Sequence, residues 1–345
     1  MRSKLNAIPL ARFSLLVGVV LFSGWINSIR TWAQDQAADQ CSLIALIGPS
    51  GDSANSSVYS NGDIYVMNPD GSNLHRLTQT EDSEFYPSWS PDGKLIVFSS
   101  NRDREDIGYE DYRIPSFNLY VMNSDGSHIR RLTRFEESSN DLQPAWSPDG
   151  KWIAYYAATR TSRWIAIIGP NGESHRDLDV KSFVDPHWSP DSTQILYSGP
   201  VENERIRQKL FLIDVDGGNI AQLTYGKGSD YGASFSPDGQ WIVFASTRDQ
   251  PEYLEAPQSD IYVMNYATGV VKRLTMNGGY TPSWSPDGSQ IAYFSPEGIN
   301  VMNSDGTLPK TILTNPSAKQ AGSQFIDLSG DYGFPVWSPW LCERP

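Results

Sequence analysis

The feature that most constrains the fold of this chain is a short motif that recurs along its length. The motif is Trp-Ser-Pro-Asp-Gly. Three copies are complete and three are degenerate: Trp89–Gly93, Trp146–Gly150, Trp188–Ser192, Phe235–Gly239, Trp284–Gly288 and Trp337–Pro339. They recur at intervals of roughly 40 to 60 residues, the length of one four-stranded propeller blade.

A second, apolar marker runs in phase with the first: Ile64–Asn68, Leu119–Asn123, Trp164–Ile168, Leu210–Asp214, Ile261–Asn265 and Ile299–Asn303. Pro and Gly in the first motif favour a tight reversal of the chain. The runs that follow, such as Leu95–Phe98, are apolar at consecutive positions, as in a strand covered on both faces. We therefore predict an all-β fold, a six-bladed β-propeller of four-stranded antiparallel blades, with each motif aromatic packed between blades.

The aromatic-Ser-Pro-Asp-Gly motif, the β-rich run after it and strands such as Tyr65–Asn68 resemble the propeller repeats of the TolB family and of related periplasmic and peptidase proteins. The resemblance covers residues 43 to 340. It implies a WD-like propeller, used in the family for binding and as an accessory domain of hydrolases. TolB itself carries an additional N-terminal α/β domain, for which we expect no counterpart here.

The last motif, at Trp337, has almost no chain after it, whereas the apolar segment Leu43–Ile47 has no motif before it. We expect these two segments to pair, so that both ends of the chain share one blade. Cys41 and Cys342 flank the pair, and we predict a disulfide between them, with two free buried thiols as the alternative.

Residues 1–33 have a basic start, an apolar run from Phe13 to Phe22 and a small-residue site near Ala33, as in a secretory signal peptide. An uncleaved anchor is the alternative, and it would be the chain's one contact with a membrane. Residues 34–42 then form a short linker, and 43–342 a single propeller. We expect an exported protein, periplasmic or extracellular.

The charge balance limits the partners. Asp and Glu total 40 against 27 Lys and Arg, for a net charge of -13, which argues against nucleic acid. A cation, a basic protein or peptide, or a neutral ligand fits better, and we expect a monomer with a protein or peptide partner.

The strand order places the tight turns on one rim of the ring and the long connections on the other, where binding surfaces are usually built. Two long loops, 101–116 and 247–259, combine charges with tyrosines. Their candidate ligand-binding residues are Arg102, Asp103, Tyr109, Tyr112, Arg248, Asp249 and Tyr253. The alternative is that these loops are solvated insertions that shield blade edges.

A second candidate site consists of acidic residues shortly before the motif aromatics: Glu84, Asp141, Asp185, Asp230 and Asp331. In a closed ring we expect them to converge on one mouth of the channel. Converging carboxylates need a cation, so the site predicts Ca²⁺ or a basic peptide segment. Alternatively, these carboxylates only cap turns and bind water.

The sequence contains no Gly-x-Ser-x-Gly elbow and no His-Glu-x-x-His motif. We therefore expect a non-catalytic binding or scaffold protein without a cofactor other than Ca²⁺. The alternative is a hydrolase or lyase acting on peptide or carbohydrate, in which Asp141, Asp185 and Asp230 at the channel mouth supply a carboxylate pair.

Overall fold

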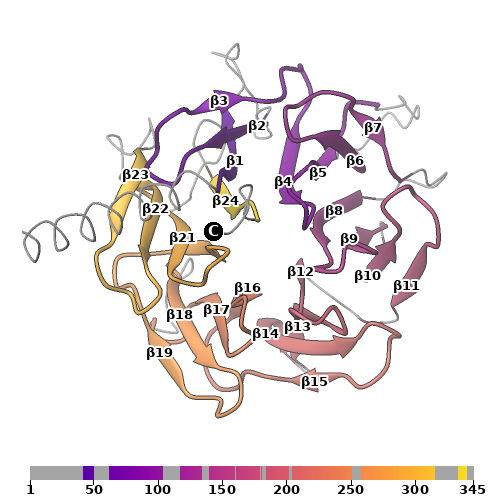
Figure 1. Ribbon diagram of the computed structural model, residues 1–345. Coiled ribbons are helices and arrows are strands. Elements are labelled where there is room, and N and C mark those ends of the chain that lie inside the picture. The colour runs from indigo at the N-terminus through magenta and orange to yellow at the C-terminus, as the bar shows by residue number, and fades with distance from the viewer. Residues whose placement is uncertain are drawn as a thin grey trace, which may run out of the picture. The chain divides into compact units, whose positions relative to one another are not determined.

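The computed structural model describes residues 42–49, 62–103, 117–133, 140–159, 161–178, 180, 184–201, 204–250, 258–314 and 333–339. Contacts divide the chain into Met1–Cys41, which lies outside the described residues, and Ser42–Pro345. The second unit contains six four-stranded sheets arranged as a ring (Figure 1). The predicted six-bladed, antiparallel β-propeller is confirmed.

Each blade has an inner strand beside the central channel and three strands outward from it. The inner strands, for blades 1 to 6, are β24 (Gly333–Trp337), β4 (Glu84–Trp89), β8 (Asn140–Trp146), β12 (Val184–Trp188), β16 (Asp230–Phe235) and β20 (Tyr280–Trp284). The second strands are β1 (Ile44–Pro49), β5 (Leu95–Ser100), β9 (Ile153–Ala158), β13 (Gln194–Val201), β17 (Trp241–Ser246) and β21 (Gln290–Ser295).

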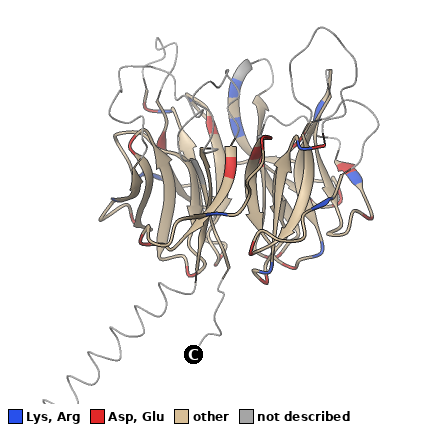
Figure 2. Cartoon of the chain, turned by 90° about the horizontal axis from the view of Figure 1, so that it is seen from above, with Lys and Arg blue, Asp and Glu red and all other residues tan. Residues whose placement is uncertain are grey.

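The third strands, which contain the second sequence marker, are β2 (Gly62–Met67), β6 (Asn118–Asn123), β10 (Arg163–Ile168), β14 (Glu204–Asp214), β18 (Asp260–Asn265) and β22 (Gly298–Asn303). The outer strands are shorter: β3 (His75–Arg76), β7 (Arg130–Arg131), β11 (Arg176–Leu178), β15 (Ala221–Gln222), β19 (Val271–Arg273) and β23 (Lys310–Thr314). The strands run between two rims, and the tight turns lie on the lower rim in Figure 2.

The motif turns are built from their own side chains. Ser90 Oγ donates to Asp92 Oδ1 at 2.7 Å and accepts from the Leu95 amide at 2.9 Å, while Gly93 takes a φ of 68°. The degenerate turn in blade 4 keeps this geometry with Ser192 at a φ of 62°. The Ser192 hydroxyl accepts a bond from the Asp149 amide of blade 3 at 3.0 Å, which compensates for placing a side chain in the left-handed region.

The core consists of six apolar clusters, each between two consecutive blades. Trp89, for example, is 5% exposed and packs between β1–β2 of blade 1 and β5–β6 of its own blade. The Trp188 indole also donates to the Ala145 carbonyl of the preceding blade at 2.9 Å. The predicted packing role of the motif tryptophans is thus confirmed for these two.

The ring closes where the sequence predicts. Strand β1 pairs with β24, with Ile44 opposite Trp337 and Ala45 opposite Val336. The Ser338 amide donates to the Leu43 carbonyl at 2.7 Å, and the Leu43 amide donates to Ser338 Oγ at 2.7 Å. Cys41 and Cys342 lie outside the described residues, so their disulfide stays a prediction.

Candidate functional site

The central channel carries a repeated irregularity. In every blade the pairing of the inner strand with its neighbour shifts register, which marks a β-bulge. In five blades the residue three places before the motif aromatic has a positive φ: Tyr86 (55°), Gln143 (55°), Asp185 (59°), Gly232 (60°) and Thr281 (45°). Non-glycine residues in this region are uncommon, and they concentrate at sites where function requires the strain.

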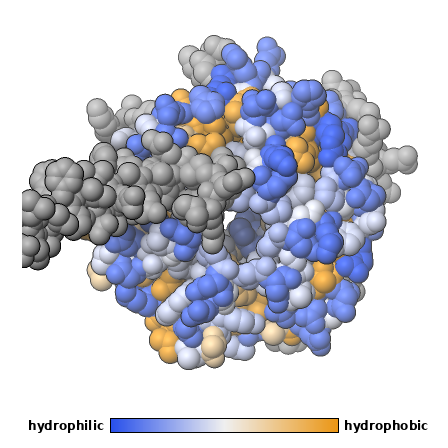
Figure 3. Space-filling model, viewed as in Figure 1, coloured by the Kyte–Doolittle hydropathy of each residue, from blue (hydrophilic) through white to orange (hydrophobic). Residues whose placement is uncertain are grey.

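These five residues, which we call the channel ring, occupy equivalent positions, and contacts from blade to blade join four of them: Gln143, Asp185, Gly232 and Thr281. Gln143 Nε2 donates to Asp185 Oδ1 at 2.5 Å, and the Asp185 amide donates to Gln143 Oε1 at 3.0 Å. The Gly232 amide hydrogen-bonds the Asp185 carboxyl in turn. A Cβ on Gly232 would lie 3.7 Å from Thr281 Cα and 3.9 Å from Asp185 Oδ2. The ring therefore links blades 3, 4, 5 and 6 around the channel opening seen in Figure 3.

Asp185 is the ring's acidic member. Burial raises its pKa to about 7, and the hydrogen bond from the Gly232 amide lowers it less. Burial also raises the pKa of Tyr86, and the charge of Asp185 raises it further, although the two residues belong to blades 2 and 4. Such an interaction between non-adjacent blades places both side chains at the channel. His187, two residues beyond Asp185, provides no positive charge because burial lowers its pKa to about 4.

The other predicted channel-mouth acids are placed differently. Glu84, Asp141 and Asp230 occupy equivalent positions at the starts of their inner strands, but they are buried at 0%, 1% and 0% exposure. Among the described residues, no three His, Cys, Asp or Glu side chains lie close enough together to hold a metal ion. Asp331 lies outside the described residues, and Ca²⁺ binding stays a prediction without a described ligand cluster.

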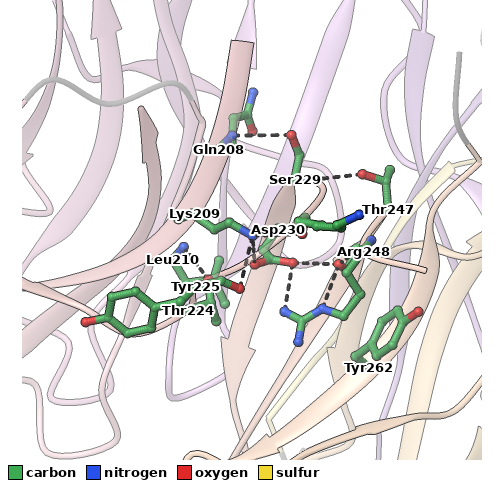
Figure 4. A network of polar contacts seen from close by, with 12 residues as sticks. Gln208, Lys209, Leu210, Thr224, Tyr225, Ser229, Asp230, Thr247, Arg248 and Tyr262 are labelled. Atoms are coloured by element: carbon green, nitrogen blue, oxygen red, sulfur yellow. Dashed lines mark hydrogen bonds and ion pairs between the residues drawn. The ribbon is translucent and has the colours of Figure 1, made fainter. Parts of the chain in front are cut away.

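Glu84 and Asp230 are each neutralised inside the protein. Glu84 Oε1 accepts from Arg102 at 2.9 Å, and Asp230 Oδ1 accepts from Arg248 at 2.8 Å. Asp230 has a second cation, because Lys209 Nζ on β14 of blade 4 lies 2.9 Å from its Oδ2 (Figure 4). Lys209 is 1% exposed and also donates to the Lys227 carbonyl at 3.1 Å. This buried ion pair joins blades 4 and 5.

The bases of the two long loops are also engaged internally. The guanidinium of Arg102 lies 5.1 Å from the ring centres of both Phe98 and Tyr120. Tyr120 donates to Asp103 Oδ2 at 2.8 Å. Blade 5 repeats the arrangement: Arg248 lies over Phe244 and Tyr262, and Tyr262 donates to Asp249 at 2.7 Å.

The loop tyrosines Tyr109, Tyr112 and Tyr253 lie outside the described residues. Ligand binding by the long loops therefore stays a prediction. The described arginines are held against their own blades by these contacts, rather than extended into solvent.

Sequence reasoning selected Asp185 but missed its ring neighbours Tyr86, Gln143, Gly232 and Thr281. A signal was present. The residue two before the motif aromatic is proline in five of the six repeats: Pro87, Pro144, Pro186, Pro282 and Pro335. The position before it varies from Tyr to Gln, Asp, Gly and Thr. Variation at one position of otherwise similar repeats was the signal that this position serves something other than the repeat itself.

Comparison with known proteins agrees with the propeller fold. Residues 116–323 match the family described as TolB beta propeller domain. The chain belongs to this TolB propeller family. A crystal structure of TolB from Acinetobacter baumannii superposes with a TM-score of 0.65 at 18% identity, over 87% of this chain and 67% of that one. That likeness concerns the fold.

Other matches of this TolB-family chain come from peptidases. Residues 16–112 match the family described as acylamino-acid-releasing enzyme, N-terminal domain. The uncharacterized peptidase YuxL of Bacillus subtilis is 28% identical over 54% of this chain and 25% of its own length. Dipeptidyl-peptidase 5 of Porphyromonas gingivalis is 29% identical over 68% of this chain and 33% of its own length. The chain thus spans a quarter to a third of these two relatives.

These matches correct the expectation that the chain is not an enzyme. That expectation relied on missing catalytic motifs, but the same propeller repeats occur in relatives described as peptidases. The absence of a motif from a propeller segment therefore does not exclude a role in catalysis. Among the residues that the structure describes, no helix is long and apolar enough to cross a membrane.

Proposed function

We propose that this TolB-family propeller recognises polypeptides, binding a peptide or an exposed segment of a protein partner in the central channel at the channel ring. The observation that carries the proposal is the ring itself. Side chains from separate blades meet at one level of the channel, around a carboxyl group that has no described cationic partner. A narrow, polar opening of this kind suits an extended chain better than a globular surface.

The relatives support a polypeptide ligand. Dipeptidyl-peptidase 5 acts, by its name, on peptides, and it shares the propeller repeats with this chain. A propeller that orients peptides would serve equally for binding a partner and for presenting a substrate. Hydrolysis by this protein is therefore a second candidate function, favoured by the peptidase relatives.

One experiment separates the two functions. A mixture of unstructured peptides is incubated with the purified protein, and bound peptides and cleavage products are both identified by mass spectrometry. Binding that is lost in Asp185→Asn but kept in Asp141→Asn supports recognition at the channel ring, and accumulation of cleaved products adds the hydrolytic function. Equal peptide retention by wild type and Asp185→Asn would contradict the proposed site.

We also propose that the protein is exported and works outside the cytoplasm as a monomer. The signal-like segment within residues 1–33 and the acidic composition support this. Cell fractionation and light scattering of the purified protein test the two statements.

A further inference from the structure

The tight-turn rim, which is the lower rim in Figure 2, carries exposed apolar side chains on one side of the ring. They project from the turns and strand ends of blades 4 to 6, and we call them the rim patch: Ile220 (55% exposed), Trp241 (38%), Tyr266 (40%), Val270 (65%) and Leu308 (78%). Among their described residues, blades 1 to 3 add one large apolar side chain of this kind to the rim, Ile129 at 37%. The six blades share a backbone plan, so the apolar side results from the side chains of these three blades.

Leu308 is the most unusual member of the rim patch, because its backbone is left-handed with a φ of 52°. The equivalent turn position in blades 1 to 4 has a φ between 47° and 56°, and it is occupied by polar residues: Asn73, His128, Ser174 and Asn219. Asparagine tolerates this conformation, whereas a bulky apolar residue is an outlier there. A leucine that is both strained and exposed contributes little to the fold, so it indicates a role outside the fold.

Blade 5 supplies the aromatic part of the rim patch. Tyr266 packs edge-on against Phe235, with ring centres 5.3 Å apart. Trp241 begins β17, which pairs with β18 up to the turn that contains Tyr266. The tryptophan at the equivalent position of blade 3, Trp152, instead packs against an apolar cluster and has the guanidinium of Arg176 5.9 Å from its ring centre. Exposed Trp and Tyr side chains are the residues that most often dominate binding to a protein partner.

A contact between blades joins the two most exposed members of the rim patch. Lys272 Nζ on β19 of blade 5 donates to the Asp305 carbonyl at 2.8 Å, in the turn of blade 6 that leads to Leu308. Val270 immediately precedes β19. Val270 and Leu308 therefore project from neighbouring segments of two blades, as parts of one surface.

The rim patch has an acidic border. The turns and adjoining strand ends of blades 4 to 6 on this rim hold six aspartates and two lysines: Asp191, Asp214, Asp216, Asp238, Asp287 and Asp305, with Lys272 and Lys310. A hydrogen bond from Ser236 holds the pKa of Asp238 below its usual range, and one from Thr307 does the same for Asp305. These two exposed carboxylates are therefore charged at neutral pH.

We infer that the rim patch is a docking surface for a basic, amphipathic segment of a protein partner, in which apolar side chains are flanked by Lys or Arg. The apolar side chains would cover the rim patch, and the basic ones would meet its acidic border. The border argues against other occupants, because a second copy of this chain would bring like charges together and anionic lipid would be repelled. The rim patch shares no residue with the channel ring, so the inference does not depend on the proposed function.

Two double variants of the full-length protein test the surface. Val270→Ser with Leu308→Asn removes two members of the rim patch, and asparagine is the residue found at this turn position in blades 1 and 4. Tyr225→Ser with Met276→Ser is the matched control, because these side chains are 70% and 79% exposed beyond the outer strands of blades 4 and 5, on the opposite rim. Since asparagine relieves the left-handed strain, Leu308→Asn alone should raise Tm by about 1 to 2 °C.

Binding is measured by fluorescence anisotropy with three labelled synthetic helices of equal length. The first has leucine on one face and lysine on the other, the second has glutamate in place of lysine, and the third has serine in place of leucine. We expect the leucine–lysine helix to bind about tenfold more tightly than either of the others. The rim double variant should lose this preference, and the control double variant should keep it.

Several results would overturn the inference. Failure of the leucine–lysine helix to bind, or equal binding of the leucine–glutamate helix, would refute a basic amphipathic partner. Equal loss in both double variants would mean that a cationic helix is attracted to an acidic protein in general. Dimerisation in light scattering, or sedimentation with phosphatidylcholine vesicles, that the rim double variant abolishes would assign the surface to a second copy or to a membrane. A fall in the Tm of Leu308→Asn would show that the leucine belongs to the scaffold.

Discussion

Asp141 should destabilise the propeller at alkaline pH, and the Asp141→Asn substitution should remove this destabilisation. Blade 3 keeps the inner-strand acid of blades 2 and 5 but not its partners. Ser100 and Arg102, which bind Glu84, are replaced at the equivalent positions by Ala157 and Thr159. Asp141 is 1% exposed, and neither carboxyl oxygen has a well-formed hydrogen bond to a described residue. Burial therefore raises its pKa to about 7, against smaller lowering effects of Thr133 and Arg131.

The magnitude follows from proton linkage. Because the pKa is about 7 in the folded chain and 3.8 for an ordinary aspartate, the folded state binds the extra proton between these values. Stability then falls as the pH rises, by up to about 1.4 kcal/mol per pH unit. Between pH 5 and pH 8 the loss from this one group is roughly 2.5 kcal/mol, and it is nearly complete once the pH exceeds 7. The sign is opposite to that of a salt-bridged aspartate.

The assay is urea unfolding of wild type and Asp141→Asn at pH 5 and pH 8. At pH 5 we expect the two free energies of unfolding to agree within about 1 kcal/mol, because the protonated acid and the amide have similar shape and polarity. At pH 8 the variant should be more stable by about 2 kcal/mol. Thr159→Arg, which restores the cation of blades 2 and 5, should also reduce the pH dependence. A variant that is less stable than wild type at pH 8 would refute the reasoning, because it would mean that the ionised carboxylate has a strong partner.

Three further predictions concern the scaffold. Lys209→Met should lower stability by about 3 to 5 kcal/mol, because it breaks a buried ion pair and removes the hydrogen bond from Lys209 to the Lys227 carbonyl. Lys94→Met, at a 79% exposed side chain, should change stability by no more than about 0.5 kcal/mol in the same unfolding assay. Ser192→Gly should be nearly neutral and Ser192→Ala destabilising by about 1 kcal/mol, since only alanine keeps the left-handed strain while losing the bond from the Asp149 amide; equal effects would contradict this account of the degenerate turn. Reduction of the native protein should lower its stability by about 3 to 5 kcal/mol if Cys41 and Cys342 are linked, and a non-reduced digest that yields two separate cysteine peptides would disprove the link.

The fold was predictable because a similar turn-and-strand motif occurs six times in the sequence. Each Ser-Pro-Asp-Gly turn specifies a reversal, and each Trp or Phe before it has one large apolar surface to bury, so the number of blades could be counted from residues alone. The pairing of β1 with β24 followed from a strand without a motif and a motif without a strand. These inferences need only local sequence and the closure of a ring.

The candidate site was harder to predict from the sequence than the fold, for a physical reason. Glu84, Asp141 and Asp230 share one repeat position, and sequence alone suggested that they converge, but whether each turns toward the channel or into its blade depends on partners elsewhere in the chain. Lys209 shows this most clearly: it stands where blades 1 and 5 have Asp63 and Asp260, and it reaches the acid of the next blade. The left-handed backbone conformations of the channel ring could not be predicted either, because Tyr, Gln, Asp and Thr do not by themselves indicate a positive φ.

Acidic residues at the starts of the inner strands have a different role from the acidic residue at the bulge: the first belong to the scaffold and the second to the candidate site. At the starts of the inner strands a carboxylate either forms an ion pair within the blades, as in Glu84 and Asp230, or is protonated below neutral pH because it is buried, as in Asp141. In both cases the group lies inside the blade, away from a ligand in the channel. At the bulge, two residues along, the residue differs in each of the five blades that have a positive φ there. Variation at the bulge leaves the interblade cores intact, because those cores are built from the second and third strands and the motif aromatics. Recognition can therefore diverge at the channel ring, while the ion pairs and tryptophans that hold the blades together stay the same.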